Sequence, residues 1–389
     1  MEYKWYLLFL GALTCAVVIA IPFMSLSVLF KEISGELGLN LVQIGLVWGS
    51  GSLPAVFTSF FAGALGDRFG SRRILVLGSL LTGLACTLQG FSTNFFSLFV
   101  SVGVFGSLTP FVFNNVFKTC GLWFPKQKLG LANGVLAMGM AFGFLLGSML
   151  SATIMSPWLD GWRHVFMFYG LLGVLFSIPW YFSRSAPASI LQTNEEMNSK
   201  SIRQAMVYVV KIRNVWMLGL TLFGVGGCIA GILGYLPLYL RGLGWPGINA
   251  DSTLGAFHTT SMVLVLPIAF WSDRIGSRKK MLLGAAVMIM SGAILLSFVD
   301  GPAIWGAVIM VGMVRDGFMA VYMTMVLELE EVGPSYAGTA TGFAMLVSGT
   351  GQLLASTIGN SFASISPGAP FIFWAVMAVL GIFCLILVR

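Results

Sequence analysis

The sequence predicts an all-α membrane protein with about twelve transmembrane helices in two parallel-repeat six-helix halves. Three observations support this prediction: a composition that suits a lipid bilayer, a series of apolar segments long enough to cross one, and a polar motif that recurs later in the chain. Of the 389 residues, 57% are hydrophobic and 9% are charged, whereas about a quarter of the residues in soluble domains are charged. A soluble fold could not hide this much apolar surface from water.

The apolar segments follow one another with mostly short connections, so consecutive helices are expected to be antiparallel neighbours. A span needs about 20 apolar residues. Segments of this kind lie at 5–30, 42–64, 74–91, 95–122, 129–156 and 164–183 in the first half of the chain, and at 214–240, 252–272, 281–299, 303–327, 337–363 and 369–388 in the second. The first segment is too long for the core of a signal peptide, and we expect it to remain as a helix.

The one long connection covers residues 184–213 and carries most of the charge found in loops. It divides the chain into an N-terminal six-helix bundle at 1–183 and a C-terminal six-helix bundle at 214–389, with a linker between them. Within this linker, residues 202–210 have apolar side chains near helical spacing. That pattern fits either a helix lying on the membrane surface or a plain linker.

A short polar and basic motif lies between the second and third segments and reads Gly63-Ala-Leu-Gly-Asp-Arg-Phe-Gly-Ser-Arg-Arg73. A second copy, Asp273-Arg-Ile-Gly-Ser-Arg-Lys-Lys280, follows the eighth segment, at an offset of 206 residues. Leu131-Ala-Asn-Gly134 and Thr339-Ala-Thr-Gly342 repeat in the same way, at an offset of 208 residues. Because both copies have the same orientation, we expect parallel repeats related by an axis along the membrane normal.

Small residues recur every four positions in the fifth and eleventh segments. They are Gly139, Gly143, Gly147 and Ser151 in the fifth, and Gly351, Ala355 and Gly359 in the eleventh. Such a ridge lets two helices approach closely inside a membrane. We therefore expect these two spans to pack tightly on their neighbours, and an interface between the two halves is one candidate place.

Lysine and arginine residues divide unequally between the two ends of the predicted spans. Sixteen lie at the end that carries the motif copies, the termini and the linker, whereas Lys31, Arg163 and Arg241 lie at the opposite end. The positive-inside rule then places both termini, the linker and both motif copies in the cytoplasm, with the protein in the cell membrane (the inner or plasma membrane). The net charge of +7 is explained by this topology, and we expect no nucleic-acid partner.

The cysteines all fall inside or at the edge of apolar segments, at Cys15, Cys86, Cys120, Cys228 and Cys384. No pair has the spacing of metal ligands, and nothing resembles a disulfide framework. We expect them to be small core residues, and we expect neither a metal nor a cofactor.

The two six-helix halves, the central linker and the motif Gly63-x-Leu65-x-Asp67-Arg68-x-Gly70-x-Arg72-Arg73 together resemble the major facilitator superfamily. The resemblance covers essentially the whole chain. It implies the major facilitator fold and a secondary transporter, in which the two halves rock around a central site. The phrases Trp123-Phe-Pro125, Gly130-x-Ala132-x-Gly134 and Gly161-Trp-Arg163 further resemble bacterial and archaeal porters of small anions, of the nitrate, cyanate, oxalate and monocarboxylate types.

Two features depart from the patterns of other subfamilies. Proton-coupled members often carry an arginine in the fourth span, but the stretch Leu98–Gly106 has no basic residue. Drug–proton antiporters usually carry a Gly-Pro pair in the fifth span, where this chain has Gly143-Phe144 and Gly147-Ser148. Both departures count against drug efflux.

The resemblance also implies a conformational latch built from the motif. Its residues are Gly63, Asp67, Arg68, Gly70, Arg72 and Arg73 in the first copy, and Asp273, Arg274, Gly276 and Arg278 in the second. Asp67 is expected near the cytoplasmic start of the eleventh span, where a helix N-terminus favours a carboxylate. Glu328 ends the tenth span on the same side, and an ion pair with the second copy would hold the cytoplasmic face closed.

Arg315 and Asp316 lie near the middle of the tenth segment, where a charge is costly. Adjacent residues point about 100° apart on a helix, so we expect that these two cannot simply neutralise each other. In the functional interpretation Arg315 holds an anionic substrate, while Asp316 orients it or takes a proton. The alternative is a structural ion pair with a group on another helix.

Other polar residues inside the spans are weaker candidates for the substrate pathway. Asn114, Asn115 and Lys118 lie in the fourth segment, the repeat counterpart of the tenth. Lys118 either faces the pathway or extends to the membrane interface. Gln352 is a candidate for a hydrogen bond with the substrate, and His258 handles a proton or is a hydrogen-bonded packing residue.

These observations predict a secondary active transporter for a small organic or inorganic anion, working by proton symport or anion exchange, and we expect a monomer. Three alternatives remain at this stage: a transporter of a neutral or zwitterionic metabolite, a drug/proton antiporter, and a membrane receptor without transport. An enzyme is not expected. Intramembrane hydrolases need paired aspartates, a Ser–His dyad or a His/Glu metal cluster, and the spans offer one mid-membrane aspartate and two distant histidines.

Overall fold

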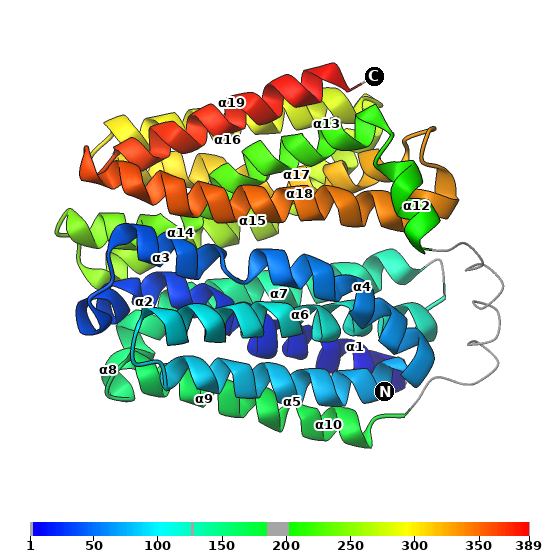
Figure 1. Cartoon of the computed structure of the whole chain (residues 1–389), viewed down its shortest axis with the longest axis horizontal. Coiled ribbons are helices and arrows are strands. Elements are labelled where there is room, and N and C mark those ends of the chain that lie inside the picture. The colour runs from blue at the N-terminus through cyan, green and yellow to red at the C-terminus, as the bar shows by residue number, and fades with distance from the viewer. Residues whose placement is uncertain (1–2, 126–127, 185–201, 389) are drawn as a thin grey trace. The chain divides into compact units, whose positions relative to one another are not determined.

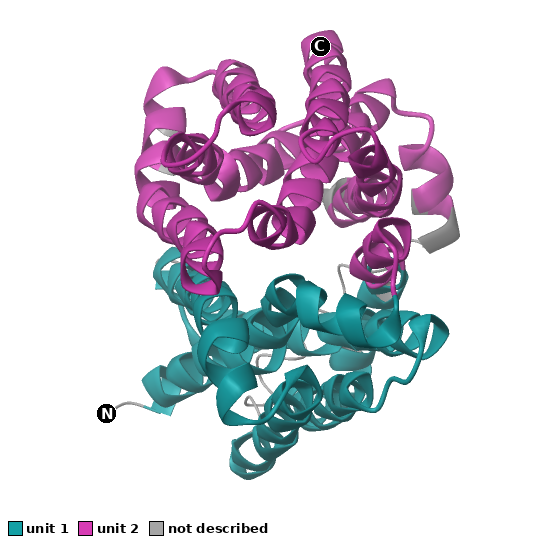
Figure 2. Ribbon diagram, turned by 90° about the vertical axis from the view of Figure 1, so that its left-hand side faces the viewer, with its two compact units in different colours: residues 1–38, 54–199 teal, residues 39–53, 200–389 magenta. Residues whose placement is uncertain are grey.

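The computed structural model describes residues 3–125, 128–184 and 202–388, and within these ranges the protein is built of helices (Figure 1). The chain forms two compact units (Figure 2). Unit 1 comprises residues 1–38 and 54–199, and unit 2 comprises residues 39–53 and 200–389.

Unit 1 holds most of the helices of the first six predicted segments. In chain order its elements are α1 (Tyr3–Thr14), the π-helical segment η1 (Cys15–Ala20), α2 (Ile21–Leu37), α4 (Ser52–Phe69), α5 (Ser71–Gly90), α6 (Phe95–Trp123), α7 (Leu129–Leu150), the π-helical segment η3 (Ser151–Met155), α8 (Ser156–Trp158), α9 (Trp162–Leu175) and α10 (Ser177–Phe182). The first three follow one another without a break, so the first predicted segment is one long helical run.

Unit 2 holds the helices of the second half of the sequence and one short helix from the first. They are α3 (Leu41–Gly49), α12 (Ile202–Val209), α13 (Arg213–Thr221), the π-helical segment η5 (Leu222–Gly226), α14 (Gly227–Gly242), α15 (Gly247–Ile275), α16 (Arg278–Phe298), α17 (Ala303–Leu327), α18 (Gly333–Ser361), the 3-10 turn η6 (Phe362–Ser364) and α19 (Ala369–Leu387). Helix α3 precedes α4 in the chain but packs on α18 and α14. The predicted limits of the two six-helix bundles, at 1–183 and 214–389, stay a prediction.

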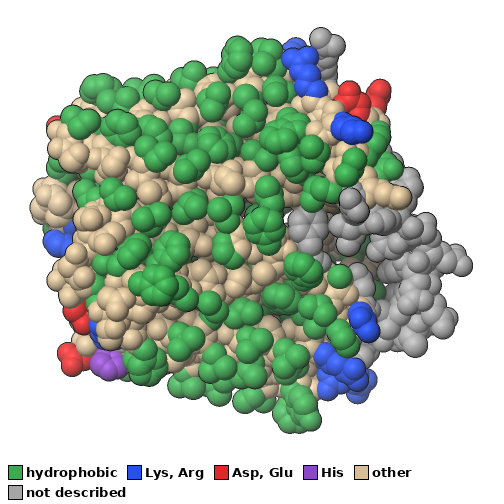
Figure 3. Space-filling view, viewed as in Figure 1, with side chains coloured by type: hydrophobic (Ala, Val, Ile, Leu, Met, Phe, Trp, Pro, Cys, Tyr) green, Lys and Arg blue, Asp and Glu red, His purple; other side chains and the backbone are tan. Residues whose placement is uncertain are grey.

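The prediction of an all-α membrane protein is confirmed. Eleven helical runs in the described residues are long and apolar enough to cross a membrane, and α18 is a further long helix outside these eleven. Large apolar side chains such as Phe96, Phe182 and Phe298 are exposed. Figure 3 shows hydrophobic side chains along the flanks of the helices and charged ones at their ends. This distribution is the one expected for helices that cross the hydrocarbon core of a bilayer and meet water at both of their ends.

The repeated motif forms a much tighter connection than a loop. Helix α4 continues to Phe69, and α5 begins at Ser71, so Gly70 alone turns the chain, with φ of 85°. In the second copy Gly276 has φ of 66°, between the end of α15 and Ser277. A positive φ is strained for residues with a Cβ, which explains a glycine at both places.

The linker contains a helix, so the plain-linker alternative is wrong for its last part. Helix α12 packs on α18. Tyr208 of α12 stacks on Tyr336 with ring centroids 4.4 Å apart, and its hydroxyl donates to the Glu331 carbonyl at 2.9 Å. Most of the rest of the predicted linker, residues 185–201, lies outside the described ranges.

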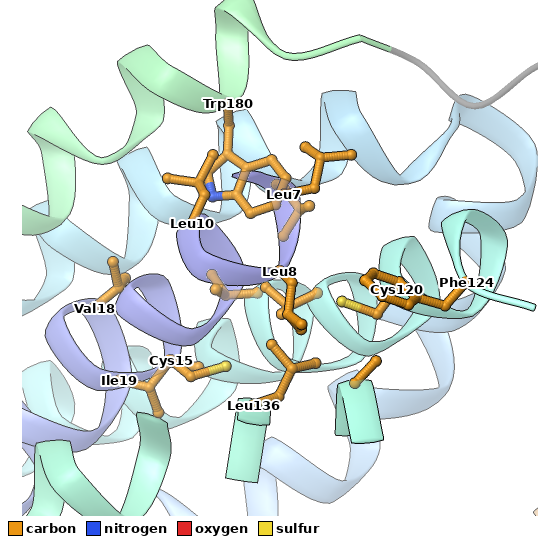
Figure 4. Close-up of a cluster of buried hydrophobic side chains, with 14 residues drawn as sticks. Leu7, Leu8, Leu10, Cys15, Val18, Ile19, Cys120, Phe124, Leu136 and Trp180 are labelled. Atoms are coloured by element: carbon orange, nitrogen blue, oxygen red, sulfur yellow. The ribbon is translucent and has the colours of Figure 1, made fainter. Parts of the chain in front are cut away.

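The core of unit 1 forms where the first helical run meets α6, α7 and α10 (Figure 4). Leu7, Leu8 and Leu136 are buried there, and Trp180 lies above them with its indole N–H donating to Thr14 Oγ1 at 2.9 Å. The bond satisfies the one polar atom of the indole ring inside an apolar cluster. All five cysteines are buried and free, as predicted.

The ridge of small residues in α7 packs on the first helical run. A Cβ added to Gly143 would lie 2.7 Å from Ala16 Cα, and one added to Gly139 would lie 2.6 Å from the Ala12 carbonyl oxygen. In unit 2, a Cβ on Gly351 would lie 2.5 Å from the Phe223 carbonyl oxygen in η5. The tight packing is confirmed, and each of these glycines packs within its own unit.

We expect Gly143→Val to destabilise the protein by about 1–3 kcal/mol, because the added carbons overlap the backbone of η1 and the helices must separate. The matched control is Gly134→Val on the same helix, where an added Cβ would meet nothing within 4 Å. The midpoint of thermal unfolding of the purified variants in detergent measures the difference. Equal midpoints for the two variants would show that this contact contributes little.

Candidate functional site

The charges predicted at mid-membrane lie in α17 and pair with each other. Arg315 Nη1 donates to Asp316 Oδ1 at 2.5 Å, and the two side chains are 21% and 25% exposed. The expectation that these neighbours cannot neutralise each other is therefore wrong. The angle between their Cα–Cβ bonds does not prevent the contact, because the long arginine side chain bends around the helix to reach the carboxylate.

Helix α15 holds the backbone of α17 at this point. The backbone N–H of Asp316 donates to Ser261 Oγ at 3.1 Å. The close approach depends on Gly312, where an added Cβ would lie 2.6 Å from the Phe257 carbonyl oxygen. A small residue at a helix crossing lets a hydroxyl on one helix reach the backbone of the other.

His258 belongs to the same place. It precedes Ser261 by three residues and so lies on the same side of α15. The residue is 2% exposed, and the charge of Arg315 acts electrostatically on its imidazole ring. The structure thus brings together three predicted residues, Arg315, Asp316 and His258, and adds Ser261, which the sequence did not single out.

The remaining candidates in the spans lie on other helices. Gln352 Nε2 donates to Ser348 Oγ at 3.3 Å within its own helix, α18. Lys118 is half-buried in α6 of unit 1. The roles of Gln352 and Lys118 in substrate binding stay predictions.

Asn114 and Asn115 connect α6 to α4. Asn114 Nδ2 donates to the backbone carbonyl and the hydroxyl of Ser59 at 3.1 and 2.9 Å. Asn115 is fully buried, and its Nδ2 donates to the Ala62 carbonyl at 3.1 Å. A Cβ on Gly66 would lie 2.0 Å from Asn115 Oδ1. Both amides are thus used to hold the helix that carries the motif.

In the first motif copy, Arg72 connects α5 to the end of α10. Its guanidinium donates to the Tyr181 carbonyl and lies 5.9 Å from the centre of the Tyr181 ring. Arg68 and Arg73 are exposed, and Gly63 has open space where a side chain would be. The side chain of Asp67 lies outside the described residues, so its predicted contact with the eleventh span stays a prediction.

In the second copy, Arg278 Nε and Nη2 donate to the two carboxylate oxygens of Glu328 at 3.3 and 3.2 Å, and Nη1 donates to Ser272 Oγ at 3.0 Å. The predicted contact between this copy and the end of α17 is present. Arg274 is exposed, and the side chain of Asp273 lies outside the described residues. The function of these contacts as a latch stays a prediction.

Sequence reasoning missed a buried ion pair between α14 and α15. Arg241 Nη2 lies 2.6 Å from Asp251 Oδ1, with side chains 9% and 1% exposed. The predicted eighth segment began at residue 252, which left Asp251 in a connection. Because α15 begins at Gly247, the carboxylate lies inside the bundle.

The phrase Gly161-Trp-Arg163 has a structural role within unit 1. Trp162 Nε1 and Arg163 Nε donate to the two carboxylate oxygens of Glu36 at 2.5 and 2.8 Å. Arg163 Nη1 also donates to the carbonyls of Gly90 and Ser92 at 3.0 and 2.5 Å. These bonds join the ends of α2 and α5 to the start of α9.

The sequence analysis also did not predict that α3 packs on the helices of unit 2. Trp48 Nε1 donates to the Ala230 carbonyl at 2.9 Å, and Asn360 Nδ2 donates to the Leu41 carbonyl at 3.0 Å. A Cβ on Gly45 would lie 2.2 Å from the Ser356 carbonyl oxygen.

The described residues contain no group of three or more His, Cys, Asp or Glu side chains that could hold a metal.

A family model described as Major Facilitator Superfamily matches residues 12–356. The probable sulfoacetate transporter SauU of Cupriavidus necator is 25% identical over 228 residues, 56% of this chain and 53% of that protein. The multidrug resistance protein MdtG of Dickeya zeae is 27% identical over 294 residues, 73% and 69% of the two chains. The cis,cis-muconate transport protein of Acinetobacter baylyi is 26% identical over 399 residues, 95% and 91% of the two chains.

Coverage differs among these relatives, since the matched part spans 53% of SauU but 91% of the muconate protein. Among solved structures, a bacterial homolog of the human lysosomal transporter Spinster, in an inward-facing and occupied conformation, has a TM-score of 0.79. It is 14% identical, and the alignment covers 100% of this chain and 97% of that chain. At this identity the likeness shows the fold alone.

We expect Arg241→Gln to lower the stability of the protein by about 3–5 kcal/mol, because it leaves the buried Asp251 carboxylate without its cation. The double variant Arg241→Gln/Asp251→Asn should recover most of this loss. Thermal unfolding in detergent measures both, with Arg213→Gln as the control, since Arg213 is an exposed arginine of the same unit. A double variant no more stable than the single one would contradict the pairing argument.

Proposed function

The chain belongs to the major facilitator superfamily of membrane transporters, and on that premise we propose that it moves a small anion across the membrane by alternating access, with Arg315 binding the anion. The transport is coupled as proton symport or anion exchange. The protein lies in the cell membrane with both termini and both motif copies in the cytoplasm, as the distribution of Lys and Arg favours.

The Arg315 side chain is the observation that carries the proposal. An arginine at the centre of a span costs about 2.5–3.5 kcal/mol on insertion scales, so a chain keeps one there for a reason. The side chain is 21% exposed. Exposure to lipid would add to the cost, and we infer that the exposed part faces the water-filled pathway, where it meets the substrate.

The relatives favour an anion without identifying it. SauU and the muconate transport protein carry names of anionic substrates, and a carboxylate or sulfonate is the natural partner of a guanidinium. MdtG is named for multidrug resistance, but this chain lacks the Gly-Pro pair expected of drug antiporters in the fifth span. A zwitterionic substrate, with one end on Arg315 and the other on Asp316, is the second candidate that the pair permits.

The two motif copies are proposed to act as a latch on the conformational cycle. Arg278 and Glu328 form an exposed ion pair, and such pairs contribute about 0–1 kcal/mol each. This small size suits a latch, because both the inward-open and outward-open states must be populated during transport.

We expect Arg315→Gln to abolish uptake of every anion that the wild type transports, because the cation that binds the anion is gone. Counterflow in proteoliposomes measures uptake, with labelled sulfoacetate, cis,cis-muconate, a zwitterionic amino acid and a neutral sugar as probes. Arg213→Gln removes one exposed positive charge from the same unit and is the control. Anion uptake that survives in Arg315→Gln would overturn the site, and uptake of the sugar alone would overturn the anion class.

For the latch we expect Asp67→Asn to lower the turnover rate several-fold while leaving the dissociation constant of the anion nearly unchanged. The reason is that Asp67 belongs to the motif at the end of α4, to which we assign the latch, whereas we assign anion binding to Arg315 of α17. Equilibrium binding and initial transport rates measured on the same preparation separate the two effects. Weaker binding at an unchanged turnover rate would contradict the assignment.

A further inference from the structure

The Arg315–Asp316 ion pair bears on how transport is coupled to protons. We propose that Asp316 is a built-in competitor, which occupies Arg315 in the empty protein and takes up one proton when an anion displaces it. The inference rests on the proposed function, because it requires that Arg315 binds the anion. It makes Asp316 a coupling residue rather than a direct ligand of the substrate.

The contact itself fits a competitor. The carboxylate of Asp316 accepts a charge-assisted hydrogen bond from Arg315 Nη1. A substrate carboxylate or sulfonate presents the same kind of oxygen to the same guanidinium. Both side chains are about one-fifth to one-quarter exposed, so the pair is accessible from outside the packed core.

The backbone beneath the pair is held, so the exchange is made by side chains. The Asp316 N–H donates to Ser261 Oγ at 3.1 Å. On either side of the pair, Gly312 and Gly317 bring α17 against α15, where an added Cβ would lie 2.6 Å from the Phe257 carbonyl oxygen and from Ile268 Cγ2 respectively. The arginine bends around the helix to reach its neighbour, and rotation of this long side chain towards a ligand releases the carboxylate.

Charge balance then requires a proton. In the empty site the pair is neutral as a whole. When an anion binds Arg315, the Asp316 carboxylate loses its cation, and an uncompensated charge in the membrane interior is unfavourable. One proton from water forms an O–H bond on the carboxylate and removes its charge, so one proton enters with each anion that displaces Asp316, whatever the charge of the anion itself. Release of the anion lets Arg315 return, and the proton leaves Asp316 again.

The titratable residues on the helices that pack against α17 are poorer candidates for the proton than Asp316. Among the described residues, helices α15, α16 and α18 pack against α17. At the level of the pair, α15 contributes His258 among the described side chains. The charged residues of α16, at 278–280, lie at its start, and the titratable residue of α18, Tyr336, lies near its start. A proton on His258 would place a second cation beside Arg315.

The decisive experiment measures anion affinity against pH in the full-length protein. The probes are sulfoacetate and cis,cis-muconate between about pH 6 and 8, where their acidic groups stay ionised because carboxyl groups ordinarily titrate near pH 4. In the wild type the dissociation constant should fall with decreasing pH, by up to about tenfold per pH unit where one proton is taken up. In Asp316→Asn, binding should be at least as tight and independent of pH.

Transport in proteoliposomes gives the second readout. Asp316→Asn should keep anion counterflow and lose the accumulation of anion driven by an imposed pH gradient. Asp300→Asn removes an exposed carboxylate of the same unit and should keep both the pH profile and the accumulation of the wild type.

The outcomes separate this inference from the function on which it rests. If the wild type and Asp316→Asn both bind an anion with the same pH profile, or if accumulation survives in the variant, the competitor role is overturned and the anion site stands. If neither anion binds either protein, both proposals are overturned. Should Asp316→Asn not fold, the wild-type profile decides alone, because a pH-independent affinity overturns the inference.

Discussion

Close packing of helices at glycine is the constraint on which both units depend. Inside a bilayer the lipid tails are as apolar as the side chains, so helices associate through contact and not through exclusion of water. Gly143 brings α7 against η1, and Gly351 brings α18 against η5. Gly312 and Gly317 bring α17 against α15 in the same way. These approaches fix which helix faces meet, and therefore which polar groups can reach one another.

Two of the π-helical segments, η1 and η5, show how far the internal repeat extends. η1 lies in the first helical run of unit 1, and η5 lies at the corresponding place in the first helical run of the second half, since Cys15 and Leu222 are 207 residues apart. This separation matches the offsets of the motif and of the Gly134 and Gly342 segments. Each π-helical segment also receives a glycine of the equivalent later helix, α7 or α18. The repeat therefore preserves a packing arrangement as well as a motif.

The polar groups inside the spans divide by what they contact. Asn115 and the Arg241–Asp251 pair are buried and contact neighbouring helices. These contacts position the helices relative to each other. The Arg315–Asp316 pair differs because both partners are partly exposed and adjacent on one helix. An ion pair made within one helix does not by itself hold two helices together, and it is to this pair that we assign the exchange with a ligand.

Features that depend on local composition and spacing could be predicted from the sequence. The apolar segments gave the spans, with 303–327 matching α17, the motif offset gave the two repeats, and the depth of Arg315 within its segment gave the candidate site. Cysteines without partners in sequence proved to be buried and free. Hydropathy and repeat offset are properties of the chain alone, so they can be read before any helix has a neighbour.

The tertiary structure alone decided which groups meet. It pairs Arg315 with Asp316 through the reach of a long side chain, and it uses the amides of Asn114 and Asn115 to hold α4. Asp251 lies inside the bundle with Arg241 because α15 begins earlier than the hydropathy indicated. Residues 39–53 join unit 2 because Gly45 and Asn360 bring α3 onto α18. Such contacts depend on which helix faces come together, and that is set by close approach between segments far apart in the chain.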